Sequence, residues 1–187
     1  MSGETTSRAP DPSIPPPSPV AVIVSRYNAS ITDALLDGAR RVWVENGGEA
    51  DALAIVDAPG SFELPVLALA AATARTGCLP HPRVAGIVAL GCLIRGQTMH
   101  DRHIARAVAH GLVSVSLKTD VPVTFGVLTV DTPEQAQDRA GGSRRNKGAD
   151  AMHALLETMR SIRTLGDGTL LRSYANRRRH LQAGGGR

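Results

Sequence analysis

Residues 84–100 read VAGIVALGCLIRGQTMH and carry the clearest structural pattern in the chain. The first seven of these residues are small or apolar at successive positions, which is typical of a strand covered on both faces, as in a parallel sheet. The glycine-containing segment that follows, residues 91–98, runs toward a helical pattern over residues 104–113. A strand, a loop and a helix in this order form one unit of an α/β fold.

Further β-favouring runs and helical patterns continue this alternation along the chain. The other strands are predicted at residues 20–24, 53–56 and 123–128, and the other helices at residues 31–42, 64–74 and 149–165. Gly47-Gly48 provides a stop signal after the first helix, and Thr132-Pro133 begins one more. This regular succession predicts an α/β sandwich in which four parallel strands lie between helices on both faces.

The length of 187 residues suits one domain, which we place at residues 20–165. Residues 1–19 hold six prolines and few large apolar groups, so we expect a disordered arm there. Residues 160–187 hold seven arginines against one acid, whereas the rest of the chain has 14 basic and 16 acidic residues. The basic character therefore belongs to the end of the chain, and we expect residues 166–187 to form a disordered tail.

Composition excludes several classes of protein. No apolar run approaches the roughly 18 residues of a membrane span, and the first residues lack the pattern of a secretory signal. Cys78 and Cys92 make no disulfide framework, so we expect buried, inert thiols and a cytoplasmic protein. Arg177-Arg178-Arg179 can contact RNA, but an aromatic content of 3% offers few platforms for stacking bases. Nucleic acid is therefore not an expected partner, except through the basic tail.

The strongest functional signal is the loop after the third predicted strand. Backbone N–H groups around Gly96, the start of a helix and the Thr98 hydroxyl together suit a phosphate group. The segment matches neither nucleotide-binding glycine motif, and the nearby histidines lack the spacing of a metal site. His100 lies just beyond the loop and can act as general acid and base, although a histidine on a helix surface is the plainer alternative.

The other strand ends carry weaker signals, each with two interpretations. Tyr27 either stacks on a flat heterocycle or covers the end of the sheet. Ser61 is a candidate helix cap, and Glu63 is either a capping carboxylate or an acceptor for ligand hydroxyl or amine groups. Arg139 either clamps a phosphate or is one more solvated basic residue.

Seven segments, taken together and in order, resemble the 6,7-dimethyl-8-ribityllumazine synthase family. They are Tyr27-Asn28 and residues 59–65, 89–100, 122–129, 134–136, 139–141 and 146–148. The resemblance implies a flavodoxin-like three-layer α/β/α sandwich. It also implies a transferase of riboflavin biosynthesis that condenses 5-amino-6-(D-ribitylamino)uracil with 3,4-dihydroxy-2-butanone 4-phosphate, without metal or cofactor.

The resemblance further implies site residues and a mode of assembly. His100 matches the proton-transfer residue. The implied substrate contacts are Tyr27, Ser61, Phe62, Glu63, Cys92, Leu93 and Ile94 for the pyrimidine and its ribityl chain, and Gln97, Thr98 and Arg139 for the phosphate. Members of the family form homopentamers, sometimes twelve of them in a 60-subunit shell, in which Phe125 and Arg139 reach into a neighbour's site.

Some positions depart from the family's pattern and keep other functions open. The family usually follows its histidine with an aromatic residue and an acid, whereas Asp101-Arg102-His103 follow here. Residues 142–145 also differ from the usual linker of small residues. A non-catalytic flavin- or lumazine-binding or shell-forming paralogue is therefore the alternative. A phosphorelay receiver shares the architecture but needs clustered acids after the first strand, where Ser25-Arg26 stand.

Overall fold

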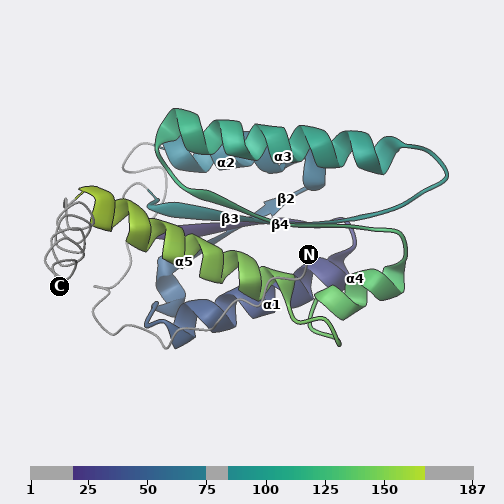
Figure 1. Cartoon of the computed structure of the whole chain (residues 1–187), viewed down its shortest axis with the longest axis horizontal. Helices are drawn as coiled ribbons and strands as arrows, with labels where there is room; N and C mark the ends of the chain where they lie inside the picture. Colours follow the sequence, from purple (N-terminus) through teal and green to yellow (C-terminus); the bar gives the residue numbers. More distant parts are fainter. Residues whose placement is uncertain (1–18, 75–83, 167–187) are drawn as a thin grey trace, which may run out of the picture.

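The structure is a computed structural model that describes residues 19–74 and 84–166. Four parallel strands form one sheet in the order β2-β1-β3-β4 (Figure 1). Their bounds are β1 Val20–Ser25, β2 Leu53–Ala58, β3 Gly86–Ile94 and β4 Val123–Val130. The predicted parallel α/β fold is confirmed. The predicted arm and tail lie outside the described residues, apart from Pro19 and Gly166.

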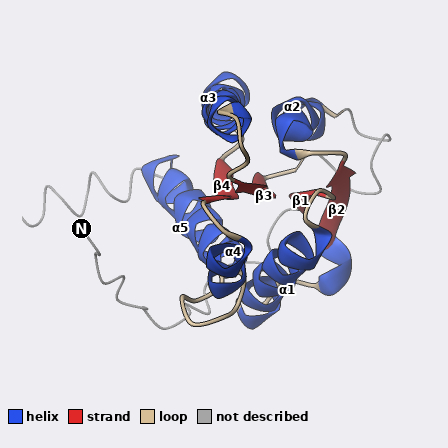
Figure 2. Ribbon diagram, turned by 90° about the vertical axis from the view of Figure 1, so that its right-hand side faces the viewer, coloured by secondary structure: helices blue, strands red, loops and turns tan. Residues whose placement is uncertain are grey.

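Helices cover both faces of the sheet. They are α1 Ala29–Glu45, α2 Leu64–Thr73, α3 His100–Thr119, α4 Pro133–Arg139 and α5 Lys147–Gly166, with the short 3-10 helices η1 Ala50–Ala52 and η2 Ser61–Glu63. Figure 2 shows α2 and α3 on one face and α1, α4 and α5 on the other. The described chain is therefore a three-layer α/β/α sandwich.

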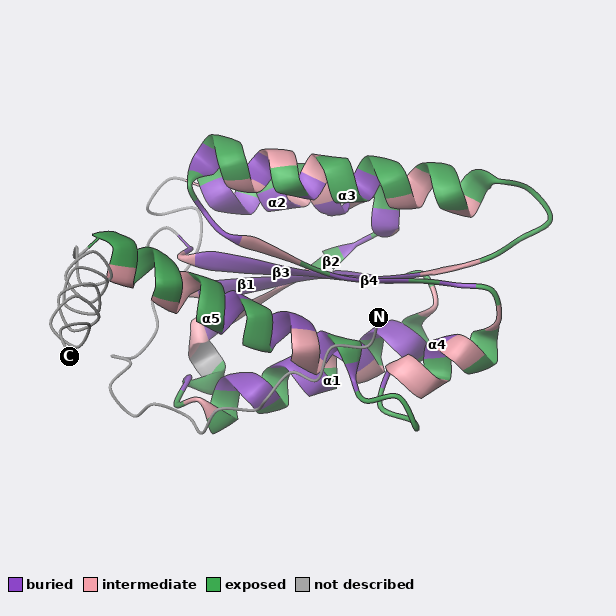
Figure 3. Cartoon of the chain, viewed as in Figure 1, coloured by how far each residue is buried: buried purple, intermediate pink, exposed green. Residues whose placement is uncertain are grey.

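Two hydrophobic cores lie on either side of the sheet. Val20, Val22 and Val24 of β1 pack toward α1 and α5, while Ala21 and Ile23 pack toward α2 and α3. Every residue of β1 is buried, as the colouring of the sheet in Figure 3 shows. Burial on both faces explains why the strand runs are apolar at successive positions, since each fully buried Val or Ile side chain stabilises the fold by about 1.5–3 kcal/mol.

The central strand β3 extends further than its apolar run predicts. Its pairing with β1 ends at Leu90, but its pairing with β4 continues through Cys92 opposite Leu128 to Ile94 opposite Val130. Gly91 therefore belongs to the strand, and the loop comprises only residues 95–99. The interstrand hydrogen bonds to β4 keep the backbone extended at Gly91, although the local sequence predicts a turn there.

Two further local expectations need correction. The helix predicted from Ile104 begins at His100, because its polar first turn contributes nothing to the apolar periodicity. Ser61 does not cap a helix: it lies inside η2 after Gly60, and its buried hydroxyl has no hydrogen-bond partner among the described residues. None of the described helices is long and apolar enough to cross a membrane.

Candidate active site

A cavity of about 640 Å³ lies beyond the carboxyl ends of β1, β2 and β3. Three connecting segments form its walls: the β1–α1 turn, η2 with the residue before it, and the end of β3 with the loop into α3. Its lining residues are Tyr27, Asn28, Gly60, Ser61, Phe62, Glu63, Cys92, Leu93, Ile94, Arg95, Gly96, Thr98, His100, Asp101 and Ile104. This is the position at which parallel α/β sheets bind ligands.

Most of the candidate site residues meet at this cavity. Those that line it are Tyr27, Ser61, Phe62, Glu63, Cys92, Leu93, Ile94, Thr98 and His100. Gln97 is exposed and does not line it, although Gly96 and Thr98 on either side do. Phe125 and Arg139 belong to a different cavity of about 610 Å³. Within one chain, the candidate residues thus separate into two groups.

Two aromatic side chains stand at the first cavity with most of their surface free. Tyr27 is 70% exposed and Phe62 is 61% exposed. Such exposure is unusual for large apolar rings in a chain that has only five aromatic residues. Both rings leave a face available to a flat ligand, which an aromatic ring contacts by offset stacking.

Asn28 ties the β1–α1 turn to the end of β3. Its backbone adopts the left-handed conformation, with φ of 60°, and its Nδ2 donates a 3.0 Å hydrogen bond to the carbonyl oxygen of Cys92. This amide replaces the strand hydrogen bonds that β1 no longer supplies beyond Leu90. Asn28 is not among the site residues predicted from the sequence. The signal was present, because Asn is among the few residues that readily adopt this conformation at the end of a strand.

The loop before α3 presents polar groups to the same cavity. The Thr98 hydroxyl accepts a 3.4 Å hydrogen bond from the backbone N–H of His100, which is the first residue of the helix. Gly96 has open space where a side chain would stand. Thr98 and His100 are both exposed, and the imidazole can exchange protons with a ligand bound against the helix start.

Cys92 lines the cavity as a buried residue of β3. Its side chain is fully buried, and burial raises the pKa of the thiol to about 11. The group is therefore protonated near neutral pH and is a poor nucleophile. The prediction of a buried thiol is confirmed for Cys92, while Cys78 lies outside the described residues. Among the described residues, no cluster of three or more His, Cys, Asp or Glu side chains is arranged to hold a metal ion.

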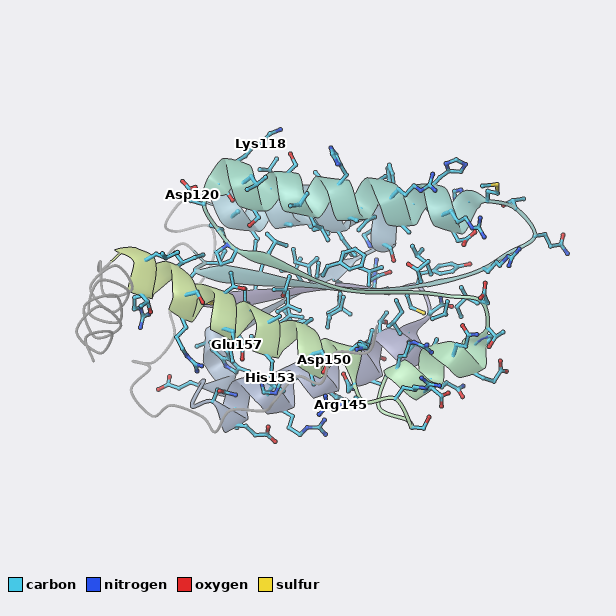
Figure 4. All side chains as sticks on the ribbon, in the orientation of Figure 1. Lys118, Asp120, Arg145, Asp150, His153 and Glu157 are labelled. Carbon is cyan, nitrogen blue, oxygen red and sulfur yellow. The ribbon has the colours of Figure 1, made fainter. Side chains whose placement is uncertain are left out.

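The second cavity lies against β4 and the helices that follow it. Phe125 is 45% exposed there, and Arg139 Nη1 donates a 3.0 Å hydrogen bond to the carbonyl oxygen of Gln135. Lys147 forms a 2.7 Å ion pair with Asp150 on the first turn of α5, along which Figure 4 labels Asp150, His153 and Glu157. An aromatic ring and two cationic side chains thus lie at a cavity beside the edge strand β4.

Sheet order and cavity position together define a flavodoxin-like α/β protein with a small-molecule site at the carboxyl edge of its sheet. The sequence profile of the 6,7-dimethyl-8-ribityllumazine synthase family matches residues 18–163, and this chain belongs to that family.

Similar proteins from three bacteria agree with this assignment. The chain is 40% identical to a protein from Thermus thermophilus named 6,7-dimethyl-8-ribityllumazine synthase. The matched region has 146 residues, which is 78% of this chain and 88% of that protein. The chain is 44% identical over 151 residues to the protein of the same name from Xanthomonas oryzae pv. oryzae, covering 81% and 94%. It is 40% identical over 156 residues to 6,7-dimethyl-8-ribityllumazine synthase 1 from Caulobacter vibrioides, covering 83% and 97%.

Proposed function

We propose that this protein condenses 5-amino-6-(D-ribitylamino)uracil with 3,4-dihydroxy-2-butanone 4-phosphate, and that it releases 6,7-dimethyl-8-ribityllumazine and inorganic phosphate. The observation that carries the proposal is the meeting of nine candidate residues, from three separate segments, around one cavity at the carboxyl edge of the sheet. Membership of the family supplies the reaction. The cavity, of about 640 Å³, is within the usual range for sites that bind small molecules.

The pyrimidine is assigned to the wall formed by the β1–α1 turn and the end of β3. Tyr27 offers an exposed ring face for stacking, and the backbone at residues 92–94 supplies hydrogen-bonding groups along the ring edge. Glu63, partly exposed at the end of η2, accepts hydrogen bonds from the ribityl hydroxyl groups. The support for this arrangement is the exposure of Tyr27 and the tether from Asn28 to Cys92, which holds the two walls together.

The phosphorylated ketone is assigned to the loop at residues 95–99. The start of the 20-residue helix α3 adds a positive dipole end, and the exposed loop leaves backbone N–H groups free to bind phosphate oxygens. In the reaction, the substrate amine attacks the ketone and water leaves to give an imine. Phosphate leaves by elimination, and closure of the ring onto the remaining carbonyl group expels a second water. Each step moves a proton, which is the role proposed for His100.

We propose that the catalytic site is completed by a neighbouring subunit in a homopentamer. Phe125 and Arg139 line the second cavity rather than the first, so within one chain they do not meet the other candidate residues. The outer side of α2 is apolar, with Val66 63% exposed and Leu69 42%, and the adjoining α3 exposes Val113 (52%) and Leu117 (78%) among basic residues such as Arg106 and Lys118. A helix that is apolar on its outer side as well as its inner side is normally covered by another surface.

The activity is tested by mixing the purified protein with both substrates and recording the fluorescence of the lumazine product. We expect product from the parent protein, and a rate about 10²-fold lower for His100→Ala because general acid–base catalysis contributes this much or more. His153→Ala removes an exposed histidine on α5 that lines neither cavity, and serves as the matched control. Tight ligand binding by folded protein without any turnover would contradict the proposal.

The assembly is tested separately by light scattering. A mass near five times the 19.6 kDa of one chain is expected for the homopentamer. A mass corresponding to one chain at concentrations where the enzyme is active would refute the composite site. A mass near that of sixty chains would identify the larger shell.

A further inference from the structure

Within a single chain, the first cavity is short of positive charge for the ligand proposed to bind there. Its lining contains the carboxylates Glu63 and Asp101, together with His100 and Arg95. Among the described lining residues, Arg95 is the one side chain that is cationic at every physiological pH. A phosphate monoester brings between one and two negative charges at neutral pH, so a second counter-charge from the chain that carries the loop would add to that of Arg139 from the neighbouring subunit.

The backbone at Arg95 is held by a hydrogen bond, whereas its side chain is largely exposed. The N–H of Arg95 donates a 2.8 Å hydrogen bond to the carbonyl oxygen of Val130, which is the last bond between β3 and β4. The side chain is 57% exposed and leaves the backbone directly before Gly96, in the same cavity as Thr98. A long cationic side chain on a fixed base can therefore reach a group bound at the loop.

The present partner of the guanidinium is weak. Arg95 Nη1 lies 3.4 Å from Asp131 Oδ1, and the Asp131 side chain is 64% exposed. An exposed pair with a single long contact contributes little to stability. A phosphate dianion offers a guanidinium two parallel charge-assisted hydrogen bonds, which makes it the stronger partner.

We propose that Arg95 binds the phosphate group of the four-carbon substrate, and that Asp131 is the counter-ion that holds the same guanidinium when the phosphate is absent. The inference rests on the proposed function, which supplies the phosphorylated substrate. Arg95 then neutralises the phosphate from within the chain that carries the loop. Asp131 competes with the phosphate, so the two residues have opposite effects on phosphate affinity.

The test uses the full-length protein and three variants, Arg95→Ala, Arg95→Lys and Asp131→Asn. For Arg95→Ala we expect KM for the butanone phosphate to rise about tenfold, as for the loss of one charge-assisted contact, with KM for the uracil substrate nearly unchanged. Arg95→Lys keeps the charge but not the planar fork of the guanidinium, so its KM should lie between those of Arg95→Ala and the parent.

Asp131→Asn should lower KM for the butanone phosphate by about two- to threefold because it removes the competitor. Arg41→Ala, at an exposed arginine of α1 away from both cavities, is the control and should change neither KM.

Calorimetric titration with inorganic phosphate separates this inference from the proposed function. Weaker phosphate binding by Arg95→Ala and tighter binding by Asp131→Asn would support the role of Arg95 even if the parent protein formed no lumazine. Equal phosphate affinity and equal KM in an active parent and Arg95→Ala would overturn it. A parallel loss of phosphate affinity in Arg95→Ala and Asp131→Asn would also overturn it, because that pattern identifies a structural ion pair.

Discussion

Gly91 allows η2 to lie directly against β3. A Cβ atom at this position would stand 2.7 Å from Ser61 Oγ and 3.3 Å from atoms of Leu64 and Val127. The Ser61 hydroxyl is enclosed at this contact and has no hydrogen-bond partner among the described residues. Because η2 carries Phe62 and Glu63 to the cavity, the glycine determines how far that wall stands from β3.

Gly91→Ala is expected to move η2 away from the sheet and to reduce kcat/KM for lumazine formation. We also expect a loss of about 1–3 kcal/mol in the free energy of unfolding, the usual effect of overpacking. Adding Ser61→Ala removes the oxygen that the new methyl group meets, so the double variant should be more stable than Gly91→Ala alone. Denaturant unfolding and product fluorescence measure both effects. Additive losses in the double variant would disprove this contact as the cause.

Cys92 makes stability depend on alkaline pH. Burial raises the pKa of its thiol from about 9 to about 11, so the native state favours the protonated form. The stabilising effect is complete below pH 9, where the unfolded chain is also protonated, and is lost as the pH rises toward 11. Relative to Cys92→Ala, the parent should lose about 2 kcal/mol of unfolding free energy across this range. Parallel pH profiles for the two proteins would show that the thiol makes no such contribution.

Asn146 fastens the start of α5 to α1 and to the end of α4. Its Nδ2 donates hydrogen bonds to the carbonyl oxygens of Ala34 and Ala140 at 2.7 and 2.9 Å. Its Oδ1 accepts hydrogen bonds from the N–H groups of Gly148 and Ala149 at 2.9 and 3.0 Å. The residue is 8% exposed, so all four bonds are largely shielded from water.

Gly148 and Gly38 permit the close contact of α1 and α5. A side chain at Gly148 would collide with the backbone of Leu35, and one at Gly38 would collide with Asn146. Both glycines therefore serve the approach of two helices rather than a turn. The asparagine and its partners come from three helical segments that are separated in sequence but adjacent in the fold.

Asn146→Ala is expected to reduce the free energy of unfolding by about 2–4 kcal/mol, because it leaves buried backbone donors and acceptors without partners. Asn46→Ala is the matched control. Its Nδ2 makes a single 2.9 Å bond to the carbonyl oxygen of Val42 at the end of α1, so a loss of about 1 kcal/mol or less is expected. Chemical denaturation of both variants provides the comparison. Similar losses would mean that the four-bond arrangement adds nothing beyond an ordinary helix-end contact.

The two helical layers of the molecule expose different kinds of side chain to solvent. On the face covered by α2 and α3, large apolar side chains remain exposed along both helices. On the other face, α1 presents exposed Asp33, Asp37, Arg40 and Arg41. The apolar outer side of α2, continued by Val113 and Leu117 of α3, supports this layer as the surface proposed to meet a neighbouring subunit, although α3 also exposes Arg106 and Lys118.

Val66→Lys is expected to lower the mass of the proposed assembly in light scattering and to reduce activity with it, because the proposed composite site requires a neighbour. Val44→Lys on α1 is the matched control, since Val44 is 57% exposed and Val66 is 63% exposed. Val44→Lys should leave the mass and the rate unchanged. An unchanged mass for Val66→Lys would remove α2 from the subunit contact.

Local sequence pattern was sufficient for the class of fold, and it indicated the loop that is proposed as the centre of the site. Apolar runs at successive positions identified the four parallel strands, because burial on both faces demands that pattern in any such sheet. The loop around Gly96 and Thr98 and the histidine after it were also readable, because a helix start with small residues has a local chemistry that suits anions. The family resemblance added residues that no local pattern marks, such as Phe62 and Leu93.

Contacts between distant segments could be known only from the folded chain. The bond from Asn28 to Cys92 spans 64 residues, and the contact between Arg95 and Asp131 spans 36. The separation of Phe125 and Arg139 from the first cavity follows from the place of β4 at the edge of the sheet. The order of the strands and the packing of glycines against neighbouring elements depend on the whole core at once, and for this reason no window of sequence encodes them.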